Sequence, residues 1–189
     1  MKSIIIGNGP SLTPALLESL DGETWAVNRI WKMFGMTTWR PDNWVRGELP
    51  DYNEEAVKED FRMMRDTGCH LWIQEGFTGH SNLLAGANLT TFRTCDGTQE
   101  HDWHLPRVCG YGTVVNIAMQ LAIINGATEL ELVGCDLGMP AHFYGQEGNR
   151  DGDELALNAH RIAAWCSPVP VIIRTMLTNV YRSNHDRRS

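Results

Sequence analysis

Short apolar runs alternate along the chain with segments of helical periodicity. This alternation is typical of an open, mainly parallel sheet with helices on both faces, and it predicts an α/β fold of the Rossmann-like, doubly wound type. The apolar runs of strand length are Ser3–Ile6, Thr24–Val27, Trp44–Val45, Leu71–Ile73, Leu130–Val133 and Val169–Ile173.

Four segments carry helix signals. Thr13 followed by Pro14 is typical of an N-cap and a first helical residue, and it predicts a helix through Leu20. A charged segment with apolar residues three and four positions apart predicts an amphipathic surface helix, and a largely apolar segment that Gly126 ends predicts a buried helix. These two segments are 53–65 and 113–125, and a last helix is predicted over 153–165.

Residues 76–110 interrupt this alternation of strands and helices. They are rich in Gly, Asn, Thr and His and show little periodicity apart from one strand at Leu89–Arg93. Such an irregular segment in a compact domain is typical of an insertion near the ligand or of a lid. Since no linker or internal repeat divides the chain, residues 1–189 are predicted to form a single domain.

The composition is that of a soluble globular protein, with 42% hydrophobic and 21% charged residues. A formal net charge of -7 argues against nonspecific binding to nucleic acid or to anionic membranes. No apolar run approaches the ~20 residues that span a bilayer, and the first residues lead into a glycine turn rather than a signal peptide. Five scattered cysteines without a CxxC pair predict reduced thiols and a cytoplasmic protein, and the sequence leaves a homo-oligomer open.

The turn after the first predicted strand is the first candidate binding site. It contains Gly7, Asn8, Gly9, Pro10 and Ser11, and it lies at the carboxyl edge of the sheet, where ligands of such folds bind. Glycines there permit positive φ angles and a close backbone approach, and the N-terminus of the helix behind suits a phosphate. The Asn and Ser side chains add donors for a nucleotide. A purely structural turn is the alternative.

This turn departs from the dinucleotide fingerprint. Leu12 replaces the third glycine, and Asn28 stands at the end of the second strand, where the ribose-binding acidic residue is expected. No Gly-Lys-Ser/Thr follows the turn, which excludes a Walker A loop. NAD is therefore disfavoured, and the Asn28 amide leaves a ribose, a base edge or a sugar hydroxyl as its ligand.

A second glycine turn precedes the predicted buried helix. Gly110, Gly112 and Thr113 would place this helix N-terminus at the same edge as the first turn, and two such N-termini predict a pyrophosphate or nucleotide-phosphate cradle. Small residues at the ends of a buried helix are the alternative. Asp136, after the following strand, is a candidate to hold a metal, orient a ribose or cap the next turn.

The segment after Asp136 carries the candidate catalytic groups. His142 is the candidate general base, because a histidine transfers protons near neutral pH, and a surface loop histidine is the alternative. Tyr144 follows it. His101 and His104 have the spacing of metal ligands but lack a third partner in sequence, so no metal site is predicted.

Three tryptophans and three arginines gather between residues 29 and 46. Aromatic faces beside guanidinium groups suit stacking on sugars or bases, and core packing of the tryptophans with exposed arginines is an equal alternative. Residue 46 is predicted to point toward the ligand edge. The residues are Trp31, Trp39, Trp44, Arg29, Arg40 and Arg46.

GNGPSL directly after the first strand, Asn28 at the end of the second and Gly-x-Asp after a later strand resemble the bacterial lipooligosaccharide sialyltransferases. The resemblance implies an inverting, metal-independent glycosyltransferase. Its nucleotide-activated donor, a CMP-sugar, would be a substrate rather than a tightly bound cofactor, and its acceptor is expected to be a carbohydrate. The glycine turn and Asn28 would hold the nucleotide, residues 110–113 would meet the phosphate side, and Tyr144 would stabilise the departing phosphate.

The catalytic loop departs from that family at one position. Alignment of HFYGQ places Gln146 where the family's catalytic histidine is expected, and glutamine cannot act as a base. Either His142 takes this role, with Tyr144 and Asp136 as further catalytic candidates, or the donor and the reaction differ. A non-catalytic nucleotide-binding module is the corresponding alternative.

The chain is also similar to the archaeal-type 6-hydroxymethylpterin pyrophosphokinases, through GPSL and the Gly-x-Asp-Leu of residues 134–137. This resemblance implies transfer of diphosphate from ATP, with Mg²⁺ between phosphates and acidic side chains. Asp136 would then lie on the metal side, with Glu147, Asp151 or Asp153 as helpers. The acidic run over 147–154 is otherwise the solvated entry to a helix.

Overall fold

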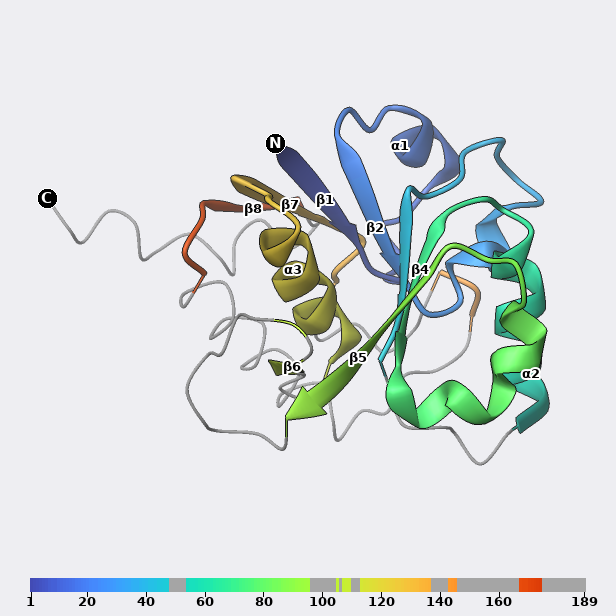
Figure 1. Cartoon of the computed structure of the whole chain (residues 1–189). Coiled ribbons are helices and arrows are strands. Elements are labelled where there is room, and N and C mark those ends of the chain that lie inside the picture. Colours follow the sequence, from blue (N-terminus) through green and yellow to red (C-terminus); the bar gives the residue numbers. More distant parts are fainter. Residues whose placement is uncertain are drawn as a thin grey trace, which may run out of the picture.

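A computed structural model describes residues 1–47, 54–95, 105, 107–109, 113–136, 143–145 and 167–174 of the chain (Figure 1). In these residues all strand pairs are parallel, and the strands form one sheet in the order β6-β5-β4-β3-β2-β1-β7-β8. The strands are β1 (Lys2–Ile6), β2 (Glu23–Val27), β3 (Asn43–Arg46), β4 (His70–Gln74), β5 (Leu89–Cys95), β6 (Arg107–Cys109), β7 (Glu129–Val133) and β8 (Val171–Arg174).

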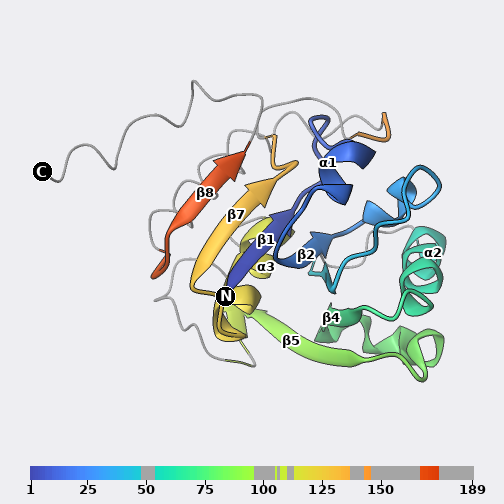
Figure 2. The same ribbon diagram turned by 90° about the horizontal axis from the view of Figure 1, so that it is seen from above.

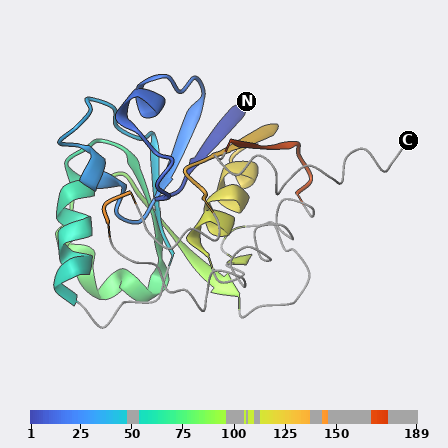
Figure 3. The same ribbon diagram turned by 180° about the vertical axis from the view of Figure 1, so that it is seen from behind.

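Helices cover both faces of this sheet, because alternate residues of the buried strands point to opposite sides. Ile5 and Trp25 pack with α3 on one face, whereas Ile4 and Ile6 belong to the core cluster that contains the apolar residues of α2. Figure 1 and the view from behind in Figure 3 place α2 and α3 on opposite sides of the sheet. The predicted α/β, Rossmann-like fold is therefore confirmed. The helices are α1 (Pro14–Glu18), α2 (Glu54–Arg65) and α3 (Val114–Ile124), with 3₁₀ segments η1 (Ile30–Met33) and η2 (Glu75–Leu84).

Several predicted bounds differ from the structure. The first helix was expected to reach Leu20 but ends at Glu18, where the Ser19 N–H donates to the carbonyls of the last turn and caps it. The last described strand begins at Val171, because Pro170 has no N–H to donate. The described parts of residues 76–110, predicted as an insertion or lid, contain η2 from its second residue onward and the strands β5 and β6. The two strands extend the sheet. The helix predicted over 153–165 lies outside the described residues.

The strand order reverses between β1 and β7. From β1 the chain adds strands in one direction as far as β6, and it then returns through α3 to place β7 on the other side of β1 (Figure 2). Ligands of open α/β sheets bind outside the carboxyl ends of the strands at such a switch point. A Cβ on Gly47 would lie 2.5 Å from Ile117 Cδ1, so the first turns of α3 lie beside the carboxyl end of β3. None of the helices in the described ranges is long and apolar enough to cross a bilayer.

Candidate functional site at the switch point

The glycine turn after β1 is bonded directly to the turn after β7. The Gly7 N–H donates to Val133 O at 2.9 Å, and the Gly9 N–H donates to Gly134 O at 2.6 Å. The Ser11 N–H donates to Asp136 Oδ2 at 2.6 Å. One oxygen of the Asp136 carboxylate therefore holds the glycine turn in place.

The glycines of this turn are required by these contacts. A Cβ on Gly7 would lie 2.5 Å from Gly134 O, and one on Gly9 would lie 2.4 Å from Asp136 Oδ2. Both glycines permit a close backbone approach, here by the chain's own β7 turn, and the close approach of a ligand stays a prediction. Neither glycine has a positive φ angle, and the left-handed residue of this contact is Gly134, at +62°. Pro10 is exposed at the tip of the turn.

Asn8 presents a hydrogen-bond acceptor at the carboxyl end of β1. The side chain is 7% exposed, and its Nδ2 donates to Val27 O at 3.2 Å, which fixes the orientation of the amide. Among the described residues, neither Asn8 Oδ1 nor the buried Ser11 Oγ has a hydrogen-bond partner. A buried polar atom without a partner costs about 1–3 kcal/mol. Asn8 Oδ1 therefore suits a ligand group that donates a hydrogen bond, and the Ser11 hydroxyl suits one that donates or accepts.

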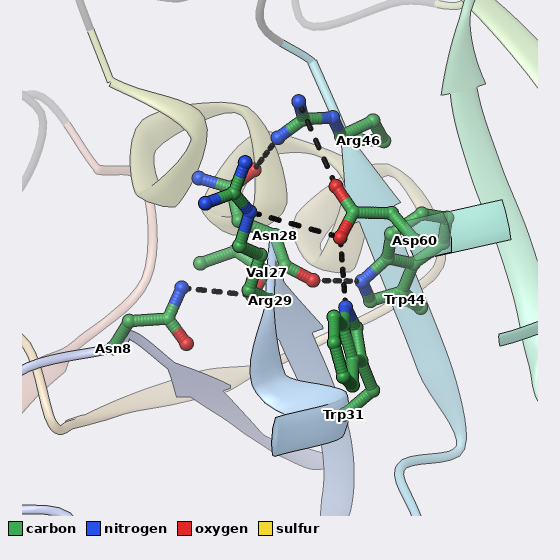
Figure 4. Close-up of polar contacts among 8 residues, drawn as sticks. All are labelled: Asn8, Val27, Asn28, Arg29, Trp31, Trp44, Arg46 and Asp60. Carbon is green, nitrogen blue, oxygen red and sulfur yellow. Dashed lines mark hydrogen bonds and ion pairs between the residues drawn. The ribbon is translucent and has the colours of Figure 1, made fainter. Parts of the chain in front are cut away.

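Asn28 follows β2 in the left-handed conformation, with φ +49°. Its N–H donates to Val45 O at 3.2 Å, and its carbonyl accepts from Trp44 Nε1 at 2.7 Å. Its side-chain Oδ1 accepts from Arg46 Nη1 at 3.2 Å (Figure 4). Asparagine is one of the few residues that tolerate this conformation, and here β3 and its end hold three of its atoms.

A buried carboxylate lies behind Asn28. Asp60 of α2 is 0% exposed, and its Oδ1 accepts from Trp31 Nε1 at 2.7 Å. Arg29 Nε and Arg46 Nη2 each form an ion pair with this carboxylate at 3.8 Å (Figure 4). Burial raises the pKa of Asp60, and the Trp31 hydrogen bond and the charges of the two arginines oppose this rise.

Phe143 and Tyr144 join the first turn to η1. The N–H of the preceding residue, Phe143, donates to Asn8 O at 2.9 Å. Lys32 Nζ of η1 stands 4.3 Å from the centroid of the Tyr144 ring, a cation–π contact. The fold thus brings the β1 turn, η1 and residues 143–145 together, although they are far apart in the sequence.

The second predicted turn is described only from Thr113 onward. The Thr113 side chain caps α3, since its Oγ1 accepts from Val115 N at 3.1 Å. In the first turn of this helix both side-chain polar atoms of Asn116 are buried without a hydrogen-bond partner in the described chain. Gly110, Gly112 and His142 lie outside the described residues, as do Gln146 and the other predicted acidic and histidine candidates: His101, His104, Glu147, Asp151 and Asp153.

Sequence reasoning missed Asp60 and left Arg46 without a role. Asp60 lies in the segment 53–65, which was predicted as an amphipathic surface helix with no role for this residue. The spacing of Asp60 in the sequence indicates its burial, because it lies three positions after Val57 and four before Met64, on the face of α2 that is buried.

Two further observations bear on the chemistry of the site. Burial raises the pKa of Cys135 to about 12, so this thiol beside the glycine turn stays protonated at neutral pH and is no nucleophile. In the described segments no group of three or more His, Cys, Asp or Glu side chains could hold a metal ion.

The fold resembles that of the MAf glycosyltransferase from Magnetospirillum magneticum AMB-1, with a TM-score of 0.64 at 15% sequence identity. The match covers 98% of this chain and 35% of that chain, so this chain spans about a third of the neighbour's length. At this identity the likeness shows the fold alone. No protein-family model matches the sequence, and no curated protein matches it.

Proposed function

We propose that the chain is a nucleotide-dependent transferase, an inverting glycosyltransferase that takes its sugar from a nucleotide-activated donor of the CMP-sugar type. The observation that carries the proposal is the pair of buried, unpartnered oxygens Asn8 Oδ1 and Ser11 Oγ at the switch point. The solved structure with the similar fold is named a glycosyltransferase, which supports this class of reaction.

The chemistry of Asn8 favours a nucleoside over a phosphate at the β1 turn. With its Nδ2 bonded to Val27 O, the side chain offers an acceptor, and an ionised phosphate has no proton to donate to it. Ribose hydroxyls and the exocyclic amine of cytosine are suitable donors. Asn28 would hold the same nucleoside, and residues 110–113 at the start of α3 would meet the phosphates.

The remaining predicted residues take roles around this nucleoside. Tyr144 would stabilise the departing phosphate, and His142 would deprotonate the acceptor hydroxyl, for which a carbohydrate is the expected source. Asp136 would keep the glycine turn in shape through the Ser11 N–H. This assignment leaves the transfer independent of a metal.

Isothermal titration against CMP, UDP, GDP, ADP and ATP, with and without Mg²⁺, tests the proposal. CMP is expected to bind without metal. If ATP binds and does so only with Mg²⁺, the proposed reaction becomes diphosphate transfer, with Asp136 on the metal side. If no nucleotide binds, both the sugar-transfer and the diphosphate-transfer proposals are overturned. Asn8→Ala is expected to weaken CMP binding at least tenfold, whereas Asn88→Ala, at the amino end of β5, leaves it unchanged.

An assay of CMP-sugar hydrolysis distinguishes the hypothesis of an enzyme from that of a non-catalytic binding module. The wild type is expected to hydrolyse the donor slowly without an acceptor, and the His142→Ala variant is expected to lose acceptor-dependent transfer. If wild type and variant are equally inert while both bind CMP, the chain is a nucleotide-binding module.

A further inference from the structure

Helix α2 carries a charged side chain where its neighbours on the same face are apolar. Val57, Phe61 and Met64 are buried in the core that covers one face of the sheet, and Asp60 lies among them with no exposed surface. An apolar residue of similar size would fill this place without the cost of desolvating a carboxylate. The carboxylate therefore needs an explanation other than packing.

The contacts of Asp60 lead to the candidate nucleotide site. Its Oδ1 accepts from Trp31 Nε1 and forms an ion pair with Arg29 Nε at 3.8 Å. Its Oδ2, which has no hydrogen-bond partner in the described chain, forms an ion pair with Arg46 Nη2 at 3.8 Å. The Nη1 of the same guanidinium donates to Asn28 Oδ1 at 3.2 Å. Figure 4 shows Arg46 between the Asp60 carboxylate and the Asn28 side chain, so a planar group joins the two.

We propose that Asp60 is a positioning residue for the nucleotide site: its ion pair with Arg46 Nη2 keeps the guanidinium where Nη1 donates to the Asn28 side chain. This inference rests on the proposed function of Asn28 as a nucleotide-binding residue. Arg46 is 3% exposed, so it acts on the ligand through Asn28. The Trp44 indole, which donates to Asn28 O at 2.7 Å, holds the backbone of the same residue.

The linkage gives Trp44 the role of a reporter. In the described part of the chain the polar contacts of Asp60 are with Trp31, Arg29 and Arg46, whereas the Trp44 indole donates to Asn28 O. A change at Asp60 that reaches Asn28 through Arg46 must therefore alter the environment of the Trp44 Nε1–H. Because the Trp44 ring also packs edge to face against Phe61 of α2, a change confined to α2 moves the Trp44 signal as well. Arg46→Lys, which leaves α2 itself unchanged, is therefore the variant that separates the route through the guanidinium from a merely structural role of Asp60.

The experiment compares Asp60→Asn with Glu59→Gln, a matched loss of one carboxylate at the neighbouring, exposed position. The ¹H–¹⁵N signals of the indole groups are recorded without ligand, and CMP affinity is measured by titration calorimetry. For Asp60→Asn we expect the Trp44 signal to move and CMP affinity to fall about tenfold, with both unchanged in Glu59→Gln. A Trp44 signal that stays in place, or CMP affinity within twofold of the wild type, overturns the proposal.

Arg46→Lys is the second variant, and it decides the question if Asp60→Asn does not fold. Lysine keeps the charge beside Asp60, but one ammonium group cannot take the place of the two guanidinium nitrogens. We expect the same movement of the Trp44 signal and the same loss of CMP affinity, and wild-type values would overturn the proposal. If the wild type binds no nucleotide, the proposed function fails, while the ligand-free Trp44 signals still decide the linkage.

Discussion

Gly9 illustrates how a single residue in this site depends on a segment far away in the sequence. Its N–H donates to Gly134 O, and the space that a Cβ would occupy belongs to the Asp136 side chain. The residue was predicted from a local motif, GNGPSL, but its necessity arises from the β7 turn. Gly9 thus belongs to a predicted ligand-binding motif and is also required for the packing of the two turns.

We predict that Gly9→Ala destabilises the fold by about 1–3 kcal/mol, because the added methyl group overlaps Asp136 Oδ2 at 2.4 Å and Gly134 O at 2.7 Å. Urea unfolding measures the loss. Gly35→Ala is the matched control, since a Cβ there meets nothing within 4 Å. Equal unfolding free energies of the two variants would contradict the close contact.

Asp60 gives a prediction on pH. Because burial raises its pKa in the folded protein above the unfolded value, the folded state binds the proton more tightly. Its contribution to the free energy of unfolding is therefore largest below the unfolded pKa of about 3.9 and is lost as the pH rises through the folded-state pKa.

Urea unfolding of wild type and Asp60→Asn between pH 4 and 7 tests this sign, because the variant has no titratable group at this position. The stability of the wild type relative to the variant is expected to grow as the pH is lowered. A difference that shrinks on acidification would show that the ionised carboxylate is a net stabiliser of the fold.

At the scale of elements, α3 both packs against the sheet and provides the helix N-terminus that is the candidate phosphate-binding group. Its apolar residues fill one face of the sheet, and its N-terminus starts at Thr113 beside the carboxyl ends of the strands. Both properties were predicted from the run of apolar residues and the Thr before it. The amphipathic character of α2 was predicted as well, but the prediction did not place Asp60 on its buried face.

Thr113→Ala is expected to cost about 1 kcal/mol of stability, because Val115 N loses its capping oxygen. Thr113→Ser keeps a hydroxyl at the same place and is expected to lose less than half of this. Thermal unfolding followed by circular dichroism compares them. If both variants melt alike, the cap does not contribute to the stability of α3.

At the scale of the whole molecule, the parallel sheet gathers its strand ends along one edge. The turns after β1 and β7 are joined there, and Asn8, Asn28 and Arg46 mark the ends of three successive strands. A ligand on this edge would contact segments from both halves of the chain. Binding should therefore stabilise the whole fold rather than one loop.

We predict that CMP at a hundredfold excess over its Kd raises the unfolding free energy by ~2.7 kcal/mol. For a protein of this size each kcal/mol shifts Tm by about 2–4 °C, so the melting temperature should rise by roughly 5–10 °C. Differential scanning fluorimetry with CMP, with Mg²⁺ alone and with ATP and Mg²⁺ measures the shift. An unchanged Tm at saturating CMP contradicts the proposed donor class.

The sequence by itself determined the parallel α/β architecture, the glycine turn at the carboxyl end of β1 and the Asn that follows β2. These features are local: apolar periodicity sets the elements, and their alternation along the chain sets the class of sheet.

Only the tertiary structure decided that Asp136 clamps the glycine turn and that Asp60 reaches Asn28 through Arg46. These contacts join segments up to 125 positions apart, and they exist because the strand order places β7 beside β1 and α2 behind β3. No pattern within a single segment encodes which strand ends become neighbours.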